Sequence, residues 1–371
     1  MADNKDKKVL NVPHLRFPEF RGEWEKIRLG DNCNILMCKR IMAVQTNTDS
    51  GVPFYKIGTI GEKADAYISK ELFDEYKKKY SFPRKGEVMI TCAGTVGKCI
   101  IYNGEDSYYQ DSNIVWIDNP DEIITNEFLY HLLRKVNWSK LNSTTIVRIY
   151  NDDLRNLKFD IPQHQEQKKI TRLLSLIDKR IATQNKIIEK LESLIKGIAH
   201  RVAGMGKPNV CLKECLECTS STLQESEVSD LGPYPVYGAN GIVGFLDSYN
   251  TPDEAIYIVK DGSGVGSVVY VKGKCSATGT LNILTAKQNY SLQFLYYLLK
   301  VFNYSPYKTG MAIPHIYFKD YGKSKIFCPP YAEQLQYAQL LVAIDTKLLA
   351  EKKILISFNS QKQYLLRELF I

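Results

Sequence analysis

The chain of 371 residues has no apolar run close to the roughly 20 residues that a membrane-spanning helix needs. Its first residues, Met1 to Lys8, are polar and no apolar stretch follows them, so we expect no secretion signal. The nine cysteines are an odd number spread along the chain, which argues against a disulfide framework. We therefore expect a cytoplasmic protein with reduced thiols and no membrane contact.

Patterns that carry catalysis or bind metals are also scarce. The sequence has five histidines and no paired motif, so no acid-base or nucleophile constellation is visible. Cys211, Cys215 and Cys218 lack a second Cys or His pair at zinc-site spacing, and we interpret them as buried small hydrophobes. The glycine-rich segment from Asp261 to Gly266 has neither the spacing nor the lysine of a nucleotide loop, so it predicts a hairpin or tight turn.

One motif resembles the Asp/Asn-Pro-Pro-Tyr motif of amino-methyltransferases, in which the first residue accepts a hydrogen bond from the target amine. It reads Cys328-Pro329-Pro330-Tyr331, and cysteine is a poor acceptor for that role. The segment is therefore interpreted as a helix entry. We expect no catalytic residue, no metal ligand and no cofactor in this chain.

The composition favours a folded protein with an anionic partner. Hydrophobic residues make up 44% of the chain and aromatic residues 11%, which is enough for two or three packed cores. The formal net charge is +8, and the pI is about 8.8. A moderately basic balance of this kind favours nucleic acid without identifying it.

An internal repeat organises the chain. Residues 162–181 align without gaps to residues 329–348, and seven of the 20 positions are identical, including the opening proline, Glu166-Gln167 with Glu333-Gln334, and Asp178 with Asp345. Upstream landmarks keep the same order in both halves. Ile27 to Leu29 faces Val210 to Leu212 at an offset of 183, and Gly94 to Gly97 faces Ser263 to Gly266 at 169. The first half therefore carries about 14 extra residues between these two landmarks. The chain is therefore predicted to be a tandem duplication.

Each repeat ends in a long helix with a coiled-coil seam. In the first, apolar residues alternate in three- and four-residue steps from Leu174 to Ile198, interrupted by Gln184; in the second, Glu351 and Lys362 interrupt the seam. A helix of about 36 residues extends roughly 54 Å, too long for one small core, so the two are expected to pack on each other. The charged seam positions indicate polar register marks or contacts with another protein. The expected packing residues are Leu174, Ile177, Ile181, Ile188, Leu191, Leu341, Ile344, Leu348 and Leu355.

The segments before the helices are rich in short β-branched runs, such as Val88 to Ile90 and Ala255 to Val259, and each has one shorter helix, Asn126 to Val136 or Ser291 to Phe302. This pattern predicts an α+β fold, with two tandem α/β domains separated by two long antiparallel coiled-coil helices. The expected divisions are residues 1–160, 161–206, 207–328 and 329–371.

Residues that read DNA are expected on loops held by these strands, because polar and basic side chains there can reach base edges and phosphates. In the first domain the candidates are Lys39, Arg40, Lys56, Thr91, Thr95, Asn113 and Arg148. In the second they are Tyr237, Asn240, Lys260, Ser263, Lys308, Thr309 and His315.

The pattern resembles the specificity subunits of type I restriction-modification systems across the whole chain. The resemblance rests on the opening Pro13-x-Leu15-Arg16-Phe17-Pro18-x-Phe20 with Trp24, and on the helix entries at Ile161-Pro162 with Glu166-Gln167 and at Pro329 with Glu333-Gln334. The chain departs from the family pattern at Cys328, where an aliphatic residue is common.

This resemblance implies two target recognition domains that read a split sequence in double-stranded DNA, at a spacing set by the helix pair. It also implies modification subunits that carry S-adenosylmethionine, and restriction subunits that use ATP and Mg²⁺. Two alternatives remain: a self-contained DNA methyltransferase, and a coiled-coil scaffold that reads no DNA.

Overall fold

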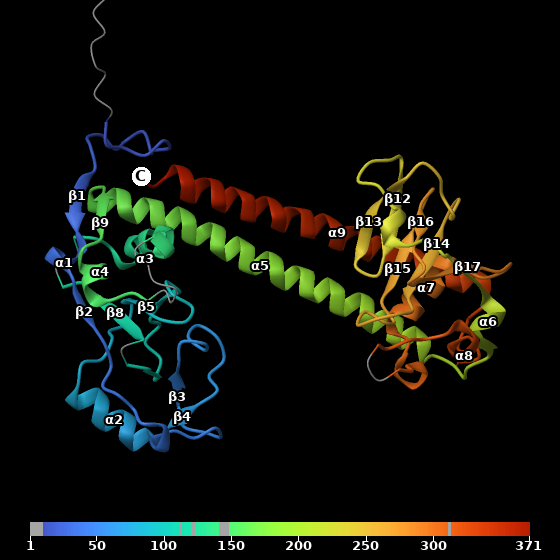
Figure 1. Cartoon of the computed structure of the whole chain (residues 1–371), viewed down its shortest axis with the longest axis horizontal. Helices are drawn as coiled ribbons and strands as arrows, with labels where there is room; N and C mark the ends of the chain where they lie inside the picture. The colour runs from blue at the N-terminus through green and yellow to red at the C-terminus, as the bar shows by residue number, and fades with distance from the viewer. Residues whose placement is uncertain (1–9, 112, 121–122, 141–147, 311–312) are drawn as a thin grey trace, which may run out of the picture. The chain divides into compact units, whose positions relative to one another are not determined.

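The computed structural model describes residues 10–111, 113–120, 123–140, 148–310 and 313–371, so the polar opening from Met1 to Lys8 lies outside the described residues. The chain forms two compact units (Figure 1). Unit 1 comprises Met1–Ile181 with Ser357–Ile371, and unit 2 comprises Ala182–Ile356. Each unit thus combines one domain with part of both long helices. Within the described ranges no helix is both long and apolar enough to span a bilayer.

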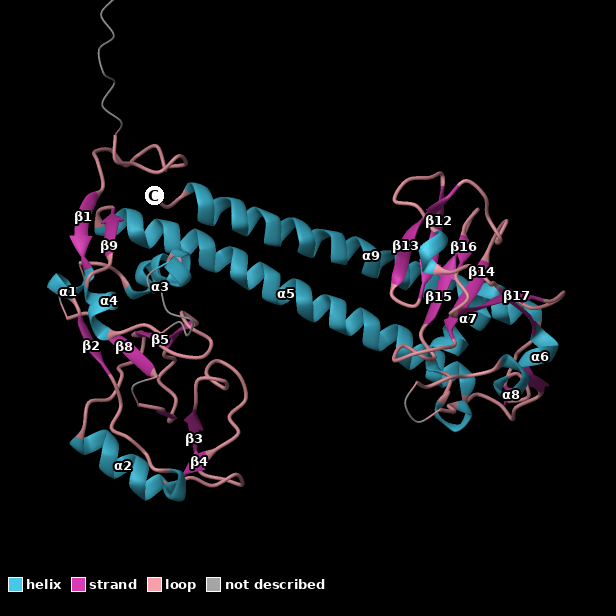
Figure 2. Cartoon of the chain, viewed as in Figure 1, coloured by secondary structure: helices cyan, strands magenta, loops and turns pink. Residues whose placement is uncertain are grey.

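The main sheet of unit 1 has four antiparallel strands in the order β2-β8-β5-β6, of which β2, β8 and β5 are labelled in Figure 2. A smaller sheet has the order β4-β3-β7, with β3 and β7 parallel. The bounds of these strands are β2 Asn34–Leu36, β3 Val52–Tyr55, β4 Tyr67–Ile68, β5 Val88–Thr91, β6 Cys99–Ile101, β7 Tyr108–Tyr109 and β8 Ile114–Asp118. The expected strand at Val88 to Ile90 is therefore confirmed as part of β5.

The main sheet of unit 2 has the same design, β11-β17-β14-β15, and the smaller sheet β13-β12-β16 again has one parallel pair. Its strands are β11 Leu216–Ser220, β12 Tyr234–Gly238, β13 Gly241–Leu246, β14 Ala255–Val259, β15 Val268–Val271, β16 Ser276–Ala277 and β17 Leu281–Ala286. The two sheet sets match strand for strand, so the duplication inferred from the sequence extends to the topology.

One element breaks the match. Helix α2 (Lys70–Lys79) lies between β4 and β5, whereas β13 and β14 are joined by a shorter loop. It buries Phe73, and the Ser69 side chain accepts a hydrogen bond from the Leu72 N–H at its start. The helix accounts for most of the extra residues that the landmark offsets place in the first half.

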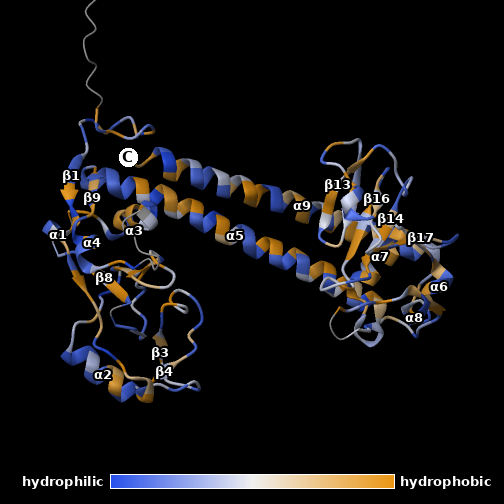
Figure 3. Cartoon of the chain, in the orientation of Figure 1, coloured by the Kyte–Doolittle hydropathy of each residue, from blue (hydrophilic) through white to orange (hydrophobic). Residues whose placement is uncertain are grey.

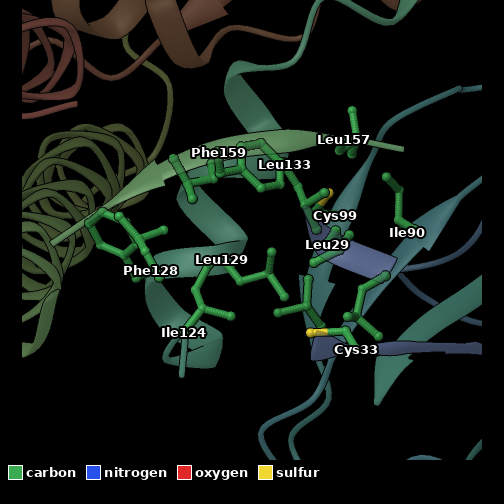
Figure 4. Close-up of a cluster of buried hydrophobic side chains, with 14 of the residues drawn as sticks. Leu29, Cys33, Ile90, Cys99, Ile124, Phe128, Leu129, Leu133, Leu157 and Phe159 are labelled. Atoms are coloured by element: carbon green, nitrogen blue, oxygen red, sulfur yellow. The ribbon is translucent and has the colours of Figure 1, made fainter. Parts of the chain in front are cut away.

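Helices α3 (Asn126–Lys135) and α7 (Leu292–Val301) cover the main sheets of their units. Each begins at a hydroxyl cap, because Thr125 and Ser291 accept hydrogen bonds from the N–H groups of Phe128 and Phe294. The apolar face of α3 meets the sheet in one buried cluster (Figure 4). A peripheral two-stranded antiparallel sheet joins the start and end of each domain, formed by β1 (Glu25–Arg28) with β9 (Lys158–Ile161), and by β10 (Val210–Cys211) with β18 (Lys325–Ile326). Short helices complete the domains: α1 Leu29–Asn32, α4 Asn151–Arg155, α6 Leu212–Cys215 and α8 Phe318–Tyr321.

The two long antiparallel helices are α5 (His164–Ala203) and α9 (Tyr331–Glu368), and apolar and polar residues alternate along both (Figure 3). Of the expected packing residues, Leu174, Ile177, Ile188, Leu341 and Leu348 are buried, whereas Ile181, Leu191, Ile344 and Leu355 are half-buried at the edges of the same clusters. The clusters lie within units, with residues 170–181 against the end of α9 in unit 1 and residues 188–199 against its first half in unit 2.

The polar seam residues pair across the two helices. The Gln184 amide donates a 3.0 Å hydrogen bond to the Glu351 carbonyl and another to the Glu351 carboxylate. The Lys362 ammonium pairs with the Asp178 carboxylate. These contacts support the register-mark interpretation, because a shift of either helix along the other would separate the partners.

Candidate nucleic-acid interface

A tight hairpin turn sits at the same place in each domain. Between β5 and β6, the Gly97 N–H donates to the Thr91 carbonyl at 2.9 Å; between β14 and β15, the Gly266 N–H donates to the Val259 carbonyl at 2.9 Å. Both glycines have positive φ, 82° and 92°. The predicted turn at Asp261 to Gly266 is therefore confirmed.

An aromatic ring supports each of these glycines. A Cβ placed on Gly97 would lie 2.2 Å from an atom of the Trp138 indole, and one on Gly266 would lie 3.0 Å from the Tyr304 ring. No side chain can be added at Gly97 without displacing the indole. The two turns are therefore held rigidly on their scaffolds, as residues that read a ligand need to be.

Two further segments are attached to each turn by backbone hydrogen bonds. In the first domain, the Cys92 N–H donates to the Asn113 carbonyl at 2.7 Å, and the Ile149 N–H donates to the Cys92 carbonyl at 2.8 Å. In the second domain Lys260 takes the place of Cys92, bonded to Thr280 at 3.0 Å and to Ile316 at 2.9 Å. Arg148 and His315, each one residue before the attached N–H, therefore occupy equivalent positions.

The first domain gathers most of its candidates beside the turn. Arg40, Lys56 and Asn113 line one hollow of about 300 Å³, and Lys39 and Arg40 line an adjoining one. The Arg40 guanidinium donates to Asp111 at 2.8 Å, and the Lys56 ammonium lies 3.0 Å from the Asp65 carboxylate. Arg148 lies over the Tyr150 ring, 5.8 Å from its centre. Basic groups and an amide thus share one face of loops, as phosphate and base contacts require.

Thr91 requires a correction. Its side chain is fully buried, and its hydroxyl donates to the Thr95 carbonyl and accepts from the Lys98 N–H at 3.0 Å. The hydroxyl is therefore committed to holding the turn and cannot reach a base edge. Thr95 is exposed at the tip of the same turn and remains a candidate.

The second domain gathers its candidates around Asp261. The His315 imidazole Nδ1 lies 2.6 Å from one Asp261 carboxylate oxygen, and the Lys260 ammonium lies 3.2 Å from the other. His315 and Thr309 exchange two backbone hydrogen bonds of 2.8 and 2.9 Å. Ser263, Lys308 and Thr309 are exposed beside them.

Asp261 is electrostatically suited to this position. Burial by itself raises the pKa of the Asp261 carboxyl, but the hydrogen bonds from His315 and Lys260 outweigh burial and leave the pKa below its usual value. The carboxylate is therefore ionised at neutral pH and acts only as an acceptor.

The remaining second-domain candidates, Tyr237 and Asn240, differ from each other. The Tyr237 ring packs edge-on against Tyr257 at 5.7 Å, on a buried cluster formed mainly by β14, β15 and β17 of the main sheet, and burial raises its pKa. Asn240 is exposed in the turn between β12 and β13. Tyr237 is therefore not brought into the loop cluster, whereas Asn240 is free to contact a ligand.

Two residues of this surface were missed by the sequence analysis. Asp261 was assigned only to the turn, and its role depends on a contact with His315, 54 residues away. Thr280 takes the place of Asn113 beside the turn, and its hydroxyl hydrogen-bonds that of Thr278 at 2.8 Å. The repeat offset of 167, which aligns Asn113-Ile114 with Thr280-Leu281, could have identified Thr280.

The Cys328 motif lies at the entry of α9. Asn209 binds its backbone twice, accepting from the Cys328 N–H at 2.9 Å and donating to the Cys328 carbonyl at 2.8 Å. The thiol is buried beside Cys215, and Cys211 and Cys218 are half-buried. Among the described residues no cluster of three or more His, Cys, Asp or Glu could hold a metal ion.

Comparison with known proteins identifies the family. The model of the type I restriction modification DNA specificity domain matches residues 21–193 and again 207–357. A putative type I restriction enzyme specificity subunit of Haemophilus influenzae is 45% identical over 189 residues, which span 51% of this chain and 46% of that protein. The putative MjaX specificity subunit of Methanocaldococcus jannaschii is 24% identical across 93% of this chain and 92% of its own length.

Solved structures share the fold. The S subunit of a type I restriction-modification system from M. genitalium aligns with a TM-score of 0.68 and 19% identity, covering 97% of this chain and 99% of that one. A chain from a study of complex assembly and conformational transition of the type I R-M system aligns with a TM-score of 0.55 and 17% identity, covering 92% and 96%. With both domains matched by the family model, the chain belongs to the DNA specificity family of type I restriction-modification systems.

Proposed function

We propose that the chain reads a bipartite sequence in double-stranded DNA, one half with each domain, as the specificity subunit of a type I restriction-modification complex. The observation that carries the proposal is the pair of equivalent loop clusters, in which the same backbone hydrogen bonds present Arg148 in one domain and His315 in the other. A duplicated scaffold with different side chains at matching positions is suited to two half-sites of different sequence.

The charge of the loops supports DNA over an uncharged ligand. The chain has a net charge of +8, and Lys39, Arg40 and Lys308 are exposed on the loop clusters. Lysine and arginine on such loops contact phosphates, which fix the register of a protein on DNA, while neighbouring amide and hydroxyl groups contact base edges.

The chemistry belongs to partner subunits in this proposal. Modification subunits bind S-adenosylmethionine and methylate adenine, and restriction subunits use ATP and Mg²⁺. Methylation of a base requires that it be flipped out of the stack into a pocket, and that pocket lies on the modification subunit. The methyltransferase alternative would need a cofactor loop and an acidic or amide acceptor, whereas the motif at the start of α9 begins with Cys328, whose backbone is bonded to Asn209.

The test assembles the chain with its modification subunit and measures binding to DNA that carries the methylated sequence, over a range of salt concentrations. Each phosphate contact contributes about −0.9 to the slope of log K against log salt. We expect a steep slope and methylation of one bipartite site. A flat slope with no sequence preference would support the scaffold alternative, and methyl transfer by the purified chain alone would support the methyltransferase.

A further inference from the structure

The His315 and Asp261 pair in the second domain has the geometry of an oriented imidazole. His315 Nδ1 lies 2.6 Å from Asp261 Oδ1, and the two side chains are 35% and 31% exposed. The backbone of His315 is fixed by its bridges to Asp261 and Thr309. Lys260 holds the second carboxylate oxygen at 3.2 Å, so the carboxylate is restrained from both sides.

The pair determines which ring nitrogen is available. An ionised carboxylate accepts hydrogen bonds and donates none, so Nδ1 must carry the proton that it shares with Asp261. Nε2 is then the remaining nitrogen, and no described residue forms a hydrogen bond with it. In the neutral imidazole Nε2 is therefore an acceptor. A carboxylate that accepts from one nitrogen in this way fixes the tautomer of the neutral ring.

The position itself indicates what Nε2 meets. His315 and Arg148 occupy equivalent positions beside the hairpin turns, each next to the N–H that is bonded to the turn. Ser263, Lys308 and Thr309 are exposed around His315, so an acceptor is surrounded by groups that suit phosphates and base edges. In the major groove, the donors that an acceptor can read are the exocyclic amines of adenine and cytosine.

We propose that His315 is a base-reading residue of the second domain and that Asp261 is its positioning residue, which holds the Nδ1 proton so that Nε2 of the neutral imidazole accepts from an exocyclic amine in the second half-site. The proposal rests on the proposed function and adds the residue, the atom and the type of base edge. Arg148 has only donors at the equivalent position, so the two domains present opposite hydrogen-bonding characters to their half-sites.

The experiment maps methylated adenines in cells that carry the full complex with single variants of this chain. His315→Ala should relax one base pair of the second half-site, with about 10-fold weaker discrimination there, and leave the first half unchanged. His315→Arg should change the preferred base at the same base pair, because donors replace the acceptor. Arg148→Ala is the matched control and should affect the first half alone.

Asp261 is tested by a graded pair of variants. Asp261→Ala frees the imidazole and should relax the same base pair as His315→Ala. Asp261→Asn keeps an oxygen that accepts from Nδ1 and should restore part of the discrimination. If Asp261 only stabilised the loop, both substitutions would lower the melting temperature and weaken DNA binding to a similar extent. The melting curve of each complex is therefore measured alongside.

The outcomes separate this proposal from the function on which it rests. If the complex with the wild-type chain methylates no defined bipartite site, the proposed function fails. If the site is defined but His315→Ala leaves it unchanged, the proposal for His315 is wrong while the function stands. Uniform weakening on all sequences, without relaxation at one base pair, would identify a phosphate contact and would likewise overturn the base-reading role.

Discussion

Units 1 and 2 repeat one scaffold but fix their helix entries differently. Gln167 and Gln334 make the same two hydrogen bonds in their units. Each side-chain oxygen accepts from the N–H of the residue that caps α3 or α7, at 2.7 and 2.9 Å. Each side-chain nitrogen donates to the carbonyl of the proline before its long helix, at 2.9 Å. Glu166 and Glu333, one residue earlier, have opposite environments. Glu166 is fully buried and receives two 2.8 Å hydrogen bonds from Arg16, whereas Glu333 is exposed.

The difference shows which part of the repeated motif is structural. Arg16 lies in the segment before β1, which also bonds α9 through the Leu15 N–H and the Glu368 carbonyl at 2.9 Å. Unit 2 provides no arginine for Glu333 among the described residues. The glutamine therefore maintains the scaffold in both units, whereas the glutamate serves to hold the opening segment in unit 1.

The largest expected effect is on DNA specificity, and it tests whether the two domains are independent. Replacing residues 24–160 with the matching domain of a related subunit should change one half of the methylated sequence completely and preserve the other half. The reason is that each loop cluster is built within its own domain. Sequencing of methylated adenines checks the result, and a change in both halves would contradict independent readers.

The next largest effect concerns stability. Arg16→Ala leaves the buried Glu166 carboxylate without its partner, which should cost about 3 to 5 kcal/mol of unfolding free energy. Glu333→Ala removes an exposed carboxylate and should change stability by less than about 0.5 kcal/mol. Thermal unfolding of the purified variants measures both. Equal effects would mean that the two glutamates have the same role and would remove the distinction between the units.

The sequence was sufficient to predict the elements that depend on local pattern and on the repeat. The β-branched runs at Val88 and Ala255, the shorter helices after Asn126 and Ser291, and the coiled-coil seam are all signals of local pattern. Helix α2 was foreseen only as extra length, because its apolar face is short: Leu72, Phe73 and Tyr76 pack on one buried cluster, but charged residues fill most of the other positions.

The candidate site was harder to predict, because exposure and partners depend on tertiary contacts. Thr91 looks like a reader from its polarity, but it ends a fully buried strand. Asp261 and Lys260 look like ordinary turn residues until the distant His315 is placed beside them. Residue type and repeat position identified the loops, while the hydrogen-bond roles within them required the fold.

A third effect depends on pH and is expected in unit 1 alone. Burial, with added repulsion from Lys362 and Arg134 and partial compensation from Asp178, lowers the pKa of His131 to about 4. The unfolded state binds a proton at this histidine more readily than the folded state does. The contribution of neutral His131 to the free energy of unfolding is therefore complete above about pH 6.5 and is lost as the pH falls toward 4. The loss should be on the order of 3 kcal/mol.

Unit 2 has Tyr297 at the equivalent position, which does not titrate in this range. The matched variant is His131→Tyr, which should remove this acid sensitivity from unit 1. Melting curves between pH 4 and 7 with a probe in each unit compare the two. If the wild-type melting of unit 1 were as insensitive to acid as that of the variant, burial of a neutral histidine would not be the cause.

The smallest effect concerns the seam. The Lys362 ammonium pairs with Asp178 in unit 1, but at the matching position in unit 2 Ile195 stands near Asp345, beside a pocket of about 420 Å³. Because the Asp178 side chain is 45% exposed, Lys362→Ile should cost only about 0.5 to 1 kcal/mol and should leave the protein folded. The difference in unfolding free energy between the wild type and this variant should become smaller at high salt, since salt screens partly exposed ion pairs.

A double-mutant cycle with Asp178→Asn isolates the pair. Once Lys362 is replaced, removing the charge of Asp178 should have little further effect, because the interaction is already lost. Fully additive effects would show that the two side chains act separately and that Lys362 matters for its packing instead. In that case unit 1 would tolerate isoleucine at this position as unit 2 does, and the charged seam residue would no longer distinguish the two helix pairs.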